Sequence, residues 1–386
     1  MSMLKKPLQS ILVKPVGPKC NLDCDYCFYL DKNELYPNAS VMNYETLDNL
    51  IKQTIEQTGR EFNITWQGGE PTLAGLDFFK KVIELQIYHG KGKTKAIGNG
   101  LQTNGLLIEN KWCDFLKEYN FMVGLSLDGP EFIHDNHRVF PNGKGSWKNV
   151  AEKGNQLRQA GVETNILCSV TKKASRYPDE IYNYFKENRW QWLQFTPICE
   201  TDKNGNITEF SVLPYDLGNF YCRIFDLWFE DFTIKGNAPS IRFIENTFHT
   251  HMGMAAAECT NQKNCGNYVV VEYNGDVYSC DFFVGQNQFL GNINKSRLTD
   301  MLNSQSQNIF GSNKENLPDK CLQCQWKKFC YGGCPKYRNI NAKENYFCQA
   351  YQIYYKHSNS RFKQLANRWE KNNPQAKMTF DASGYF

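Results

Sequence analysis

Apolar positions along the first ~200 residues follow two alternating patterns. Short apolar runs rich in β-branched and aromatic residues predict strands, and longer segments with apolar residues at i, i+3 and i+4 predict helices. The predicted strands are Ser10–Lys14, Phe62–Gln67, Lys95–Thr103, Phe121–Leu127, Glu163–Val170 and Gln191–Thr196. The predicted helices between them are Asn43–Thr58, Phe78–Tyr88, Glu109–Tyr119, Trp147–Gln159 and Asp179–Asn188. Six β/α units in series predict an α/β fold with a parallel sheet, either doubly wound or arranged as a barrel.

The first of these helices has clear signals at both ends. Its apolar residues recur at helical spacing, and Asn43 is a plausible N-cap because its side chain can accept a hydrogen bond from the first turn. Gly59 directly follows the periodic segment and predicts the stop.

The pattern changes after the sixth predicted strand. Leu213–Phe232 predicts a long aromatic-rich helix, and Tyr268–Val271 with Asp276–Ser279 predicts a hairpin around Asn274-Gly275. The segment from Cys259 to Cys348 otherwise shows little periodicity, which favours a small domain held by metal rather than by a core. After about His357 the chain predicts a helix and then an unstructured end. The expected domains are residues 1–235, 236–357 and 358–386.

Composition narrows the class of protein. The chain has 386 residues, of which 41% are hydrophobic, and a formal net charge of +4, which is too mild to indicate a nucleic-acid partner. Met1–Pro15 lacks the apolar run of a signal peptide, and no run reaches the ~18 apolar residues of a membrane helix. We therefore expect a cytoplasmic protein with no membrane partner. The 15 cysteines stand out, and at short spacings in a reducing compartment they favour metal binding over disulfides.

The most specific motif is Cys20-Asn-Leu-Asp-Cys24-Asp-Tyr-Cys27, which directly follows the first predicted strand. Three thiolates in one loop can bind three irons of a cubane cluster and leave the fourth iron open to a small molecule. The alternatives are a zinc site short of one ligand and a chance grouping.

Polar and glycine residues follow several other predicted strands. Gly68-Gly69-Glu70-Pro71 ends the second strand, where glycines let the backbone approach a ligand and Glu70 could accept a hydrogen bond from a cationic amine. Gln102–Gly105, Ser126–Pro130 and Thr196–Pro197 end later strands. In parallel barrels the carboxyl ends of the strands form the active site, although each of these segments alone is more often an ordinary turn or cap.

The C-terminal cysteines form a second group. Cys321-x2-Cys324-x5-Cys330-x3-Cys334 follows Cys259, Cys265 and Cys280 and precedes Cys348. A CxxC pair with two later cysteines is compatible with a zinc ribbon. Zinc takes four ligands, however, and this segment offers eight cysteines.

Together these motifs resemble the radical S-adenosylmethionine (radical SAM) superfamily, in which CxxxCxxC has an aromatic residue, here Tyr26, before its third cysteine. The C-terminal cysteines resemble the SPASM extension of that superfamily. Within this group the chain looks most similar to anaerobic sulfatase-maturating enzymes, on the phrases Lys14–Pro18, Thr65–Leu73, Gly124–Pro130 and Gly275–Phe282. The resemblance implies a partial (β/α)6 barrel, TIM-like, followed by a small iron–sulfur SPASM domain.

The resemblance also implies the cofactors, which are S-adenosyl-L-methionine and three [4Fe–4S] clusters. It assigns Cys20, Cys24 and Cys27 to the radical cluster. It assigns Cys259, Cys265, Cys280 and Cys334 to a first auxiliary cluster, and Cys321, Cys324, Cys330 and Cys348 to a second. Cys113, Cys168, Cys199 and Cys222 are left over, and we expect them to be structural thiols.

For S-adenosylmethionine, the resemblance implies that Gly68, Gly69 and Glu70 hold the methionine amino group. It implies further contacts from Tyr26, from Ser126 and Arg138 to the ribose and carboxylate, and from the backbone near Cys199 to the adenine. A guanidinium suits a carboxylate because its parallel N–H groups meet two oxygens. Asp281 matches the general base of the family, with Asp128 and Tyr26 as the other cavity groups to consider.

The implied reaction is oxidation of a cysteine or serine in a sulfatase to Cα-formylglycine, within an unfolded segment of Cys/Ser-x-Pro-x-Arg type. The implied electron donor is a flavodoxin- or ferredoxin-like protein. Two alternatives remain open at this point. One is another SPASM enzyme that forms thioethers or crosslinks in peptides, and the other is an iron–sulfur electron carrier without catalysis.

Overall fold

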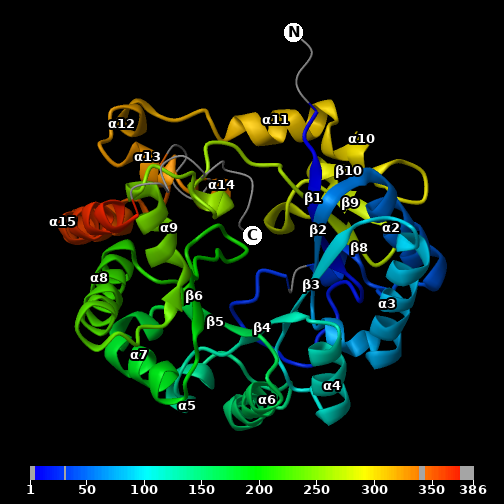
Figure 1. Ribbon diagram of the computed structural model, residues 1–386, viewed down its shortest axis with the longest axis horizontal. Helices are drawn as coiled ribbons and strands as arrows, with labels where there is room; N and C mark the ends of the chain where they lie inside the picture. Colours follow the sequence, from blue (N-terminus) through cyan, green and yellow to red (C-terminus); the bar gives the residue numbers. More distant parts are fainter. Residues whose placement is uncertain (1–4, 30–31, 339–343, 374–386) are drawn as a thin grey trace. The chain divides into compact units, whose positions relative to one another are not determined.

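The computed structural model describes residues 5–29, 32–338 and 344–373 (Figure 1). The chain divides into two compact units. The first contains residues 1–127, 134–166 and 266–311, and the second contains residues 128–133, 167–265 and 312–386. Each unit therefore combines sequence from the N-terminal half with sequence from the cysteine-rich C-terminal half.

The first unit is built on a sheet with the strand order β10-β9-β8-β1-β2-β3-β4. β1 to β4 pair in parallel, and β8 pairs in parallel with the other side of β1. β8, β9 and β10 then run antiparallel to one another. The bounds are β1 Leu8–Lys14, β2 Thr58–Trp66, β3 Ala96–Thr103, β4 Met122–Ser126, β8 Val269–Glu272, β9 Asp276–Tyr278 and β10 Phe289–Asn292.

Helices connect the strands of this unit. Their bounds are α1 Lys32–Leu35, α2 Tyr44–Gln57, α3 Leu76–Gly90, α4 Asn110–Glu118, α6 Trp147–Gln159, α10 Leu298–Leu302 and α11 Gln305–Asn313. Short 3-10 turns lie at η1 Pro71–Ala74, η5 Asp281–Phe283 and η6 Gln286–Gln288. Asn43 caps α2 as predicted, since its side chain accepts a hydrogen bond of 2.8 Å from the backbone of Thr46.

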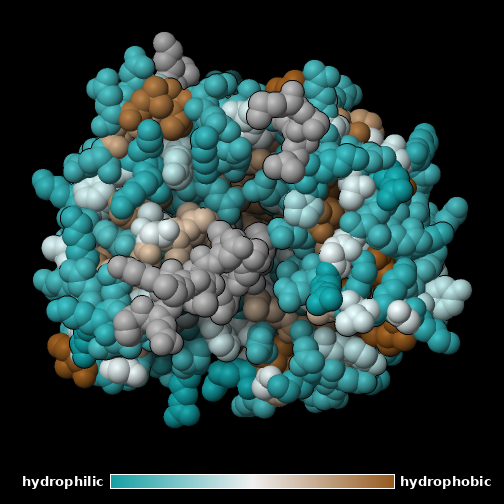
Figure 2. Space-filling model, turned by 45° about the horizontal axis from the view of Figure 1, so that its top comes forward, coloured by the Kyte–Doolittle hydropathy of each residue, from teal (hydrophilic) through white to brown (hydrophobic). Residues whose placement is uncertain are grey.

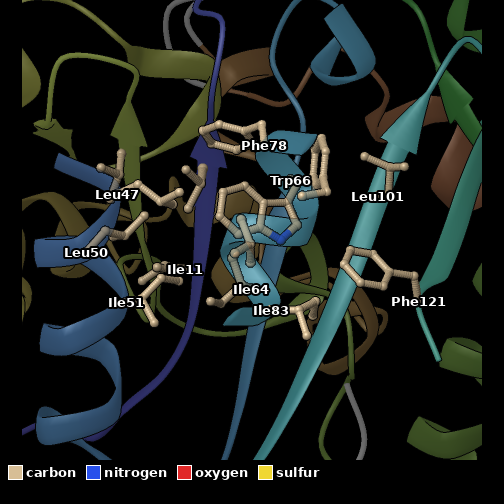
Figure 3. Close-up of a cluster of buried hydrophobic side chains, with 14 of the residues drawn as sticks. Ile11, Leu47, Leu50, Ile51, Ile64, Trp66, Phe78, Ile83, Leu101 and Phe121 are labelled. Carbon is tan, nitrogen blue, oxygen red and sulfur yellow. The ribbon is translucent and has the colours of Figure 1, made fainter. Parts of the chain in front are cut away.

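The core of the first unit lies between the sheet and the helices α2 and α3 (Figure 3). Apolar residues of β1, β2 and β3 meet the helical residues at i, i+3 and i+4, which is the pattern seen in the sequence. The labelled residues are Ile11, Ile64, Trp66, Leu101 and Phe121 with Leu47, Leu50, Ile51, Phe78 and Ile83.

The second unit contains the end of β5 (Thr164–Val170), β6 (Trp192–Pro197) and β7 (Ser240–Ile241), of which β6 and β7 pair in parallel. The long helix α15 (Cys348–Asn372) lies along α8 (Pro214–Glu230), where the rings of Phe225 and Phe362 are 4.8 Å apart. The remaining elements are α5 Glu131–His134, η2 Ala174–Arg176, α7 Pro178–Glu187, η3 Asp231–Lys235, α9 Arg242–His251, η4 Cys259–Asn261, α12 Asp319–Leu322, α13 Lys327–Cys330 and α14 Pro335–Arg338.

The six predicted strands and the helices between them all form, with ends shifted by a few residues, and the helix predicted over Leu213–Phe232 forms as α8. The helix predicted after about His357 forms as α15, but it already begins at Cys348. The predicted stop is at the right place, because α2 ends at Gln57 with Thr58 as its C-cap and Gly59 directly after it. Gly59 extends into β2 instead of taking the left-handed conformation of a typical glycine cap. The predicted hairpin also forms, as β8 and β9. The unstructured end predicted after the last helix lies outside the described residues.

The cysteine-rich region differs from the prediction in one respect. Its first part is held by an apolar core as well, because Val269, Val271, Val277, Leu298 and Leu302 are buried in the main core of the first unit. Pairing of β8 with β1 brings these valines into that core, and a short fully buried strand shows no periodic pattern in the sequence.

The surface is mostly hydrophilic on the face shown in Figure 2, where apolar residues occur as scattered patches. In the part of the chain that the structure describes, no helix is both long enough and apolar enough to cross a membrane.

Candidate active site

The loop after β1 carries the three cysteines of the CxxxCxxC motif. The backbone of Cys27 donates to the carbonyl of Cys24 at 3.0 Å, and the backbone of Leu22 donates to the Sγ of Cys20 at 3.4 Å. Burial raises the pKa of the Cys20 thiol to about 11, and negative charge on Glu70 and Cys27 adds to the effect. The thiols of Cys20 and Cys27 are thus close enough to repel each other when ionised, as two ligands of one cluster would be.

Aromatic and charged side chains pack against this loop. Tyr26, the residue before the third cysteine, is buried, and its ring lies 5.5 Å from the ring of His137. The guanidinium of Arg138 lies 5.3 Å from the centre of the same ring. His137 in turn contacts both carboxylate oxygens of Asp25, at 2.9 and 3.1 Å. Arg138 is therefore placed beside the cysteine loop rather than on a separate solvated loop.

The Gly-Gly-Glu segment after β2 packs directly on the backbone that leads to Cys20. Gly69 donates to the carbonyl of Gly17 at 2.8 Å, and Glu70 donates to the carbonyl of Lys19 at 2.7 Å. A Cβ on Gly69 would lie 2.0 Å from the oxygen of Lys19, so no side chain fits there. The glycine is thus required by close approach of two loops, one of which carries the cluster motif.

Glu70 is buried and its carboxylate accepts four hydrogen bonds. Thr72 donates its backbone N–H at 3.0 Å and its hydroxyl at 2.5 Å, Thr103 donates its hydroxyl at 2.7 Å, and Asn104 donates its backbone N–H at 2.7 Å. Burial nevertheless raises the pKa of Glu70 above its usual range. Glu70 thus connects the end of β2 to the end of β3, an arrangement that the sequence did not reveal.

The other residues predicted to contact S-adenosylmethionine or to line its cavity lie at or just after the ends of strands. Ser126 is the last residue of β4 and is buried. In the second unit, Asp128 accepts a hydrogen bond of 2.8 Å from the backbone of Ser169. Cys199 follows β6 and is buried, which raises the pKa of its thiol to about 12.

Three cysteines predicted for the first auxiliary cluster lie together in the second unit. Burial raises the pKa of the Cys259 thiol to about 12, and negative charge on Cys334 and Cys265 raises it further. The buried ammonium of Lys314 donates to the carbonyls of Cys259 and Thr260, at 2.5 and 3.0 Å, and its charge acts on all three thiols. A buried cation beside three thiols fits an anionic cluster.

The fourth cysteine of this set, Cys280, lies in the first unit. It directly precedes the turn η5, and its sulfur lies 3.6 Å from the hydroxyl of Tyr268.

The four cysteines predicted for the second auxiliary cluster line one cavity in the second unit. Aromatic residues Trp326, Tyr351 and Tyr355 form part of its wall. Burial raises the pKa of Cys330 to about 11, and charge on Cys324, Cys321 and Cys348 contributes further. Four thiols that face one cavity fit the ligand set of a [4Fe–4S] cluster.

Among the described residues, no three or more His, Cys, Asp or Glu side chains converge closely enough to hold a single ion.

Asp281 lies in a buried network at the ends of β1, β2 and β8. Its Oδ1 forms an ion pair with Lys14, the last residue of β1. Its Oδ2 accepts a hydrogen bond of 2.7 Å from Gln67, the residue after β2. Glu272, the last residue of β8, stands opposite Lys14 in the strand pairing and accepts a hydrogen bond from the hydroxyl of Tyr29.

Lys14, Gln67, Glu272 and Tyr29 were not singled out from the sequence. Lys14 and Gln67 do stand at predicted strand ends, beside the two motifs, and that position is the signal that could have identified them. Glu272 offers no comparable local signal, because only the pairing of β8 with β1 brings it to Lys14.

Glu272 makes the stability of the protein depend on pH. Its pKa is raised to about 7, mainly by burial, with repulsion from Asp281 and Asp276, while Lys14 and Tyr29 act in the opposite direction. A carboxyl whose folded pKa exceeds its unfolded value of about 4.3 stabilises the fold at low pH and loses that contribution as pH rises through 7. Between pH 6 and pH 8 we expect the unfolding free energy of the wild type to fall by about 1.4 kcal/mol because of this group. The Glu272→Gln variant lacks the titrating carboxyl and should not show this fall.

Denaturant unfolding of both proteins at several pH values measures this difference. A wild-type curve that runs parallel to the Glu272→Gln curve from pH 6 to pH 8 would contradict it.

Comparison with known proteins agrees with this geometry. Residues 15–185 match the family model of the Radical SAM superfamily, and residues 259–325 match the model of an iron–sulfur cluster-binding domain, SPASM. The fold and the cysteine sets thus define a radical SAM enzyme with a SPASM extension. The predicted α/β fold class, a partial (β/α)6 barrel followed by a small iron–sulfur domain, is confirmed by these matches.

Individual relatives narrow the class. The chain is 39% identical over 376 residues to a serine-type anaerobic sulfatase-maturating enzyme of Bacteroides thetaiotaomicron, covering 91% of this chain and 89% of that protein. It is 36% identical over 371 residues to a cysteine-type anaerobic sulfatase-maturating enzyme of Clostridium perfringens, covering 94% and 99%. A solved structure of native anSMEcpe with bound AdoMet and Cp18Cys peptide superposes with a TM-score of 0.87 at 34% identity, covering 94% of this chain and all of that one.

The chain therefore belongs to the anaerobic sulfatase-maturating enzymes. Membership in the radical SAM superfamily and the SPASM match also confirm S-adenosyl-L-methionine and [4Fe–4S] clusters as the class of cofactor that the sequence predicted.

Proposed function

We propose that this enzyme oxidises a cysteine or serine side chain of a sulfatase polypeptide to Cα-formylglycine. One observation carries the proposal. Asp281 is held by Lys14 and Gln67, which lie at the ends of β1 and β2. Along the chain, Lys14 precedes the loop of Cys20 to Cys27, and Gln67 directly precedes Gly68-Gly69-Glu70. The proposed proton acceptor thus contacts the ends of the same two strands, β1 and β2, that lead into the motifs for radical generation.

The reaction removes two hydrogens from the target side chain. A serine side chain, CH2–OH, loses one hydrogen atom, one proton and one electron and becomes the aldehyde. An auxiliary cluster would accept that electron. A cysteine side chain loses the same three particles to give a thioaldehyde, and water then replaces the sulfur, which leaves as hydrogen sulfide. Bound S-adenosylmethionine with its cluster supplies the radical chemistry that takes the hydrogen atom from the Cβ.

Asp281 receives the proton of the hydroxyl or thiol in this proposal. Lys14 pairs with Oδ1 through its charge, and Gln67 donates a hydrogen bond to Oδ2. A carboxylate has about four acceptor sites, so acceptor sites remain for the substrate. The residue is buried, with 8% of its surface exposed, so its carboxylate is largely shielded from water. A fixed carboxylate with spare acceptor sites is suited to general-base catalysis.

The remaining site residues take binding roles in the proposal. Cys20, Cys24 and Cys27 hold the radical cluster, and the two auxiliary sets of four cysteines, namely Cys259, Cys265, Cys280 and Cys334 and then Cys321, Cys324, Cys330 and Cys348, hold two further clusters. S-adenosylmethionine contacts Gly68, Gly69, Glu70, Ser126, Arg138, Tyr26 and the backbone at Cys199. The packing of Arg138 on Tyr26 supports this assignment, because it places a guanidinium beside the cysteine loop.

The partners follow from the reaction. We propose an unfolded or nascent sulfatase segment of Cys/Ser-x-Pro-x-Arg type as substrate, since relatives of both the cysteine and the serine type match this chain. A flavodoxin- or ferredoxin-like protein would deliver the electron that starts each turnover. A cytoplasmic location is consistent with cysteines that remain reduced thiols.

Anaerobic turnover of three matched peptides tests the proposal. The peptides carry cysteine, serine or alanine at the target position and are otherwise identical. Mass spectrometry should find formylglycine from the cysteine or serine peptide and no change in the alanine peptide. Consumption of S-adenosylmethionine with all three peptides unchanged, or with a crosslink in their place, would overturn the proposed substrate.

A further inference from the structure

Lys14 is a charged side chain in a position that normally excludes charge. It ends β1, is fully buried, and is neither a proposed cluster ligand nor one of the proposed contacts to S-adenosylmethionine. An isolated buried ammonium would cost several kcal/mol, so its partners decide why it is there. They come from three separate parts of the first unit.

The first partner is the carboxylate of Asp281, whose Oδ1 forms the ion pair with Nζ. The second is the ring of Tyr29, whose centre lies 3.3 Å from the same nitrogen, an arrangement in which the electron-rich face attracts the cation. The third is Glu272, which the parallel pairing of β1 and β8 places opposite Lys14.

Tyr29 and Glu272 are also joined to each other. The hydroxyl of Tyr29 donates to Oε1 of Glu272, while its ring contacts Lys14. Glu272 thus fixes the ring that contacts the ammonium, and its charge interacts with that of Lys14. The ring and the ion pair with Asp281 together define the position of the ammonium.

We propose that Lys14 is the positioning residue that fixes the reactive orientation of the Asp281 carboxylate, with Tyr29 and Glu272 holding Lys14 in place. This inference rests on the proposed role of Asp281 as the base. Lys14 forms an ion pair with Oδ1, and Gln67 donates a hydrogen bond to Oδ2, so a charge and a donor on neighbouring strand ends oppose rotation of the carboxylate. The remaining acceptor sites of the Asp281 carboxylate then point in one fixed direction, toward the substrate.

The test compares Lys14→Met with the doubly changed Lys14→Met/Glu272→Gln protein. Methionine keeps the length of the side chain and removes its charge. The double variant also removes the negative charge of Glu272, so that this second carboxylate is not left buried without its cation. Lys95→Met is the matched control. Lys95 directly precedes β3 and donates to the carbonyl of Thr58 at the start of β2, in the same unit but away from this network.

The readout is the amount of formylglycine formed per 5′-deoxyadenosine released, together with iron content. We expect both Lys14 variants to keep their iron and to release 5′-deoxyadenosine without peptide, while formylglycine per 5′-deoxyadenosine falls about 10–100-fold. The Lys95→Met control should stay at the wild-type ratio. A wild-type ratio in the charge-balanced double variant would overturn the inference.

A combination with Asp281→Asn separates a positioning role from a merely structural one. If Lys14 acts through Asp281, adding Lys14→Met to Asp281→Asn causes no further loss of formylglycine, whereas losses that multiply contradict the inference. The two proposals fail differently. Full activity of Asp281→Asn alone overturns Asp281 as the base, and an impaired Asp281→Asn with an unimpaired Lys14 variant overturns only the role of Lys14.

Discussion

Replacing Cys20, Cys24 and Cys27 together by alanine should abolish release of 5′-deoxyadenosine from S-adenosylmethionine. The three thiolates are the only protein ligands proposed for the radical cluster, so alanine at these positions leaves that cluster without attachment. If the two auxiliary sets each hold a cubane as well, iron per chain should fall by about one third, from about twelve to about eight. Iron analysis and chromatography of anaerobic reaction mixtures measure both quantities.

Changing two cysteines that lie outside all three sets provides the control. Cys113 is buried in the core of the first unit, and Cys222 lies on α8 in the second. Alanine at both positions should leave iron content and cofactor cleavage at the wild-type level. Continued release of 5′-deoxyadenosine by the triple variant would show that the cluster motif has been assigned wrongly.

Asp281→Asn should reduce formylglycine formation by about 10²–10⁴-fold, the usual contribution of a positioned base. Asparagine keeps the shape of the side chain and one oxygen for Lys14, but its amide cannot take a proton at neutral pH. The amide of Gln67 can turn to offer its oxygen to the new NH2 group, so the local packing should survive. Cluster content and release of 5′-deoxyadenosine without peptide should therefore remain unchanged.

Asp276→Asn is the matched control for this substitution. Asp276 lies five residues earlier on β9, where it accepts hydrogen bonds from Asn274 and Asn292 at the turn of the hairpin. Its change therefore tests the same substitution at a carboxylate that is engaged by the turn. It should retain wild-type formylglycine yield. Near-normal yield from Asp281→Asn, with its clusters verified, would remove Asp281 from the mechanism and direct attention to Asp128 or Tyr26.

Local sequence was sufficient to predict most of the first unit. The strands before Cys20 and Gly68 and the helix capped by Asn43 each depend on neighbours within about ten residues, where periodicity and capping act. The Cys20, Cys24 and Cys27 spacing is local in the same way. The resemblance to a known family then supplied roles for residues, such as Asp281, whose immediate sequence fits an ordinary turn equally well.

Contacts between distant segments were not predictable in this way. Glu272 meets Lys14 only because β8 adds to the free side of β1, and no local pattern specifies which strand a short buried run will join. The same holds for Glu70, whose partners Thr103 and Asn104 follow a different strand. At Gly59 the position of the helix end was predictable, but its conformation was not, because strand β2 begins directly after α2 and the residue extends into it instead of forming a left-handed cap.

The most direct test of the account follows the hydrogen atom that the reaction removes. A substrate peptide whose target cysteine or serine carries deuterium at both Cβ positions is incubated with the reconstituted enzyme, reductant and S-adenosylmethionine. The account predicts one deuterium in 5′-deoxyadenosine for each formylglycine formed, because the radical takes its hydrogen from that carbon. Formylglycine accompanied by unlabelled 5′-deoxyadenosine would contradict it.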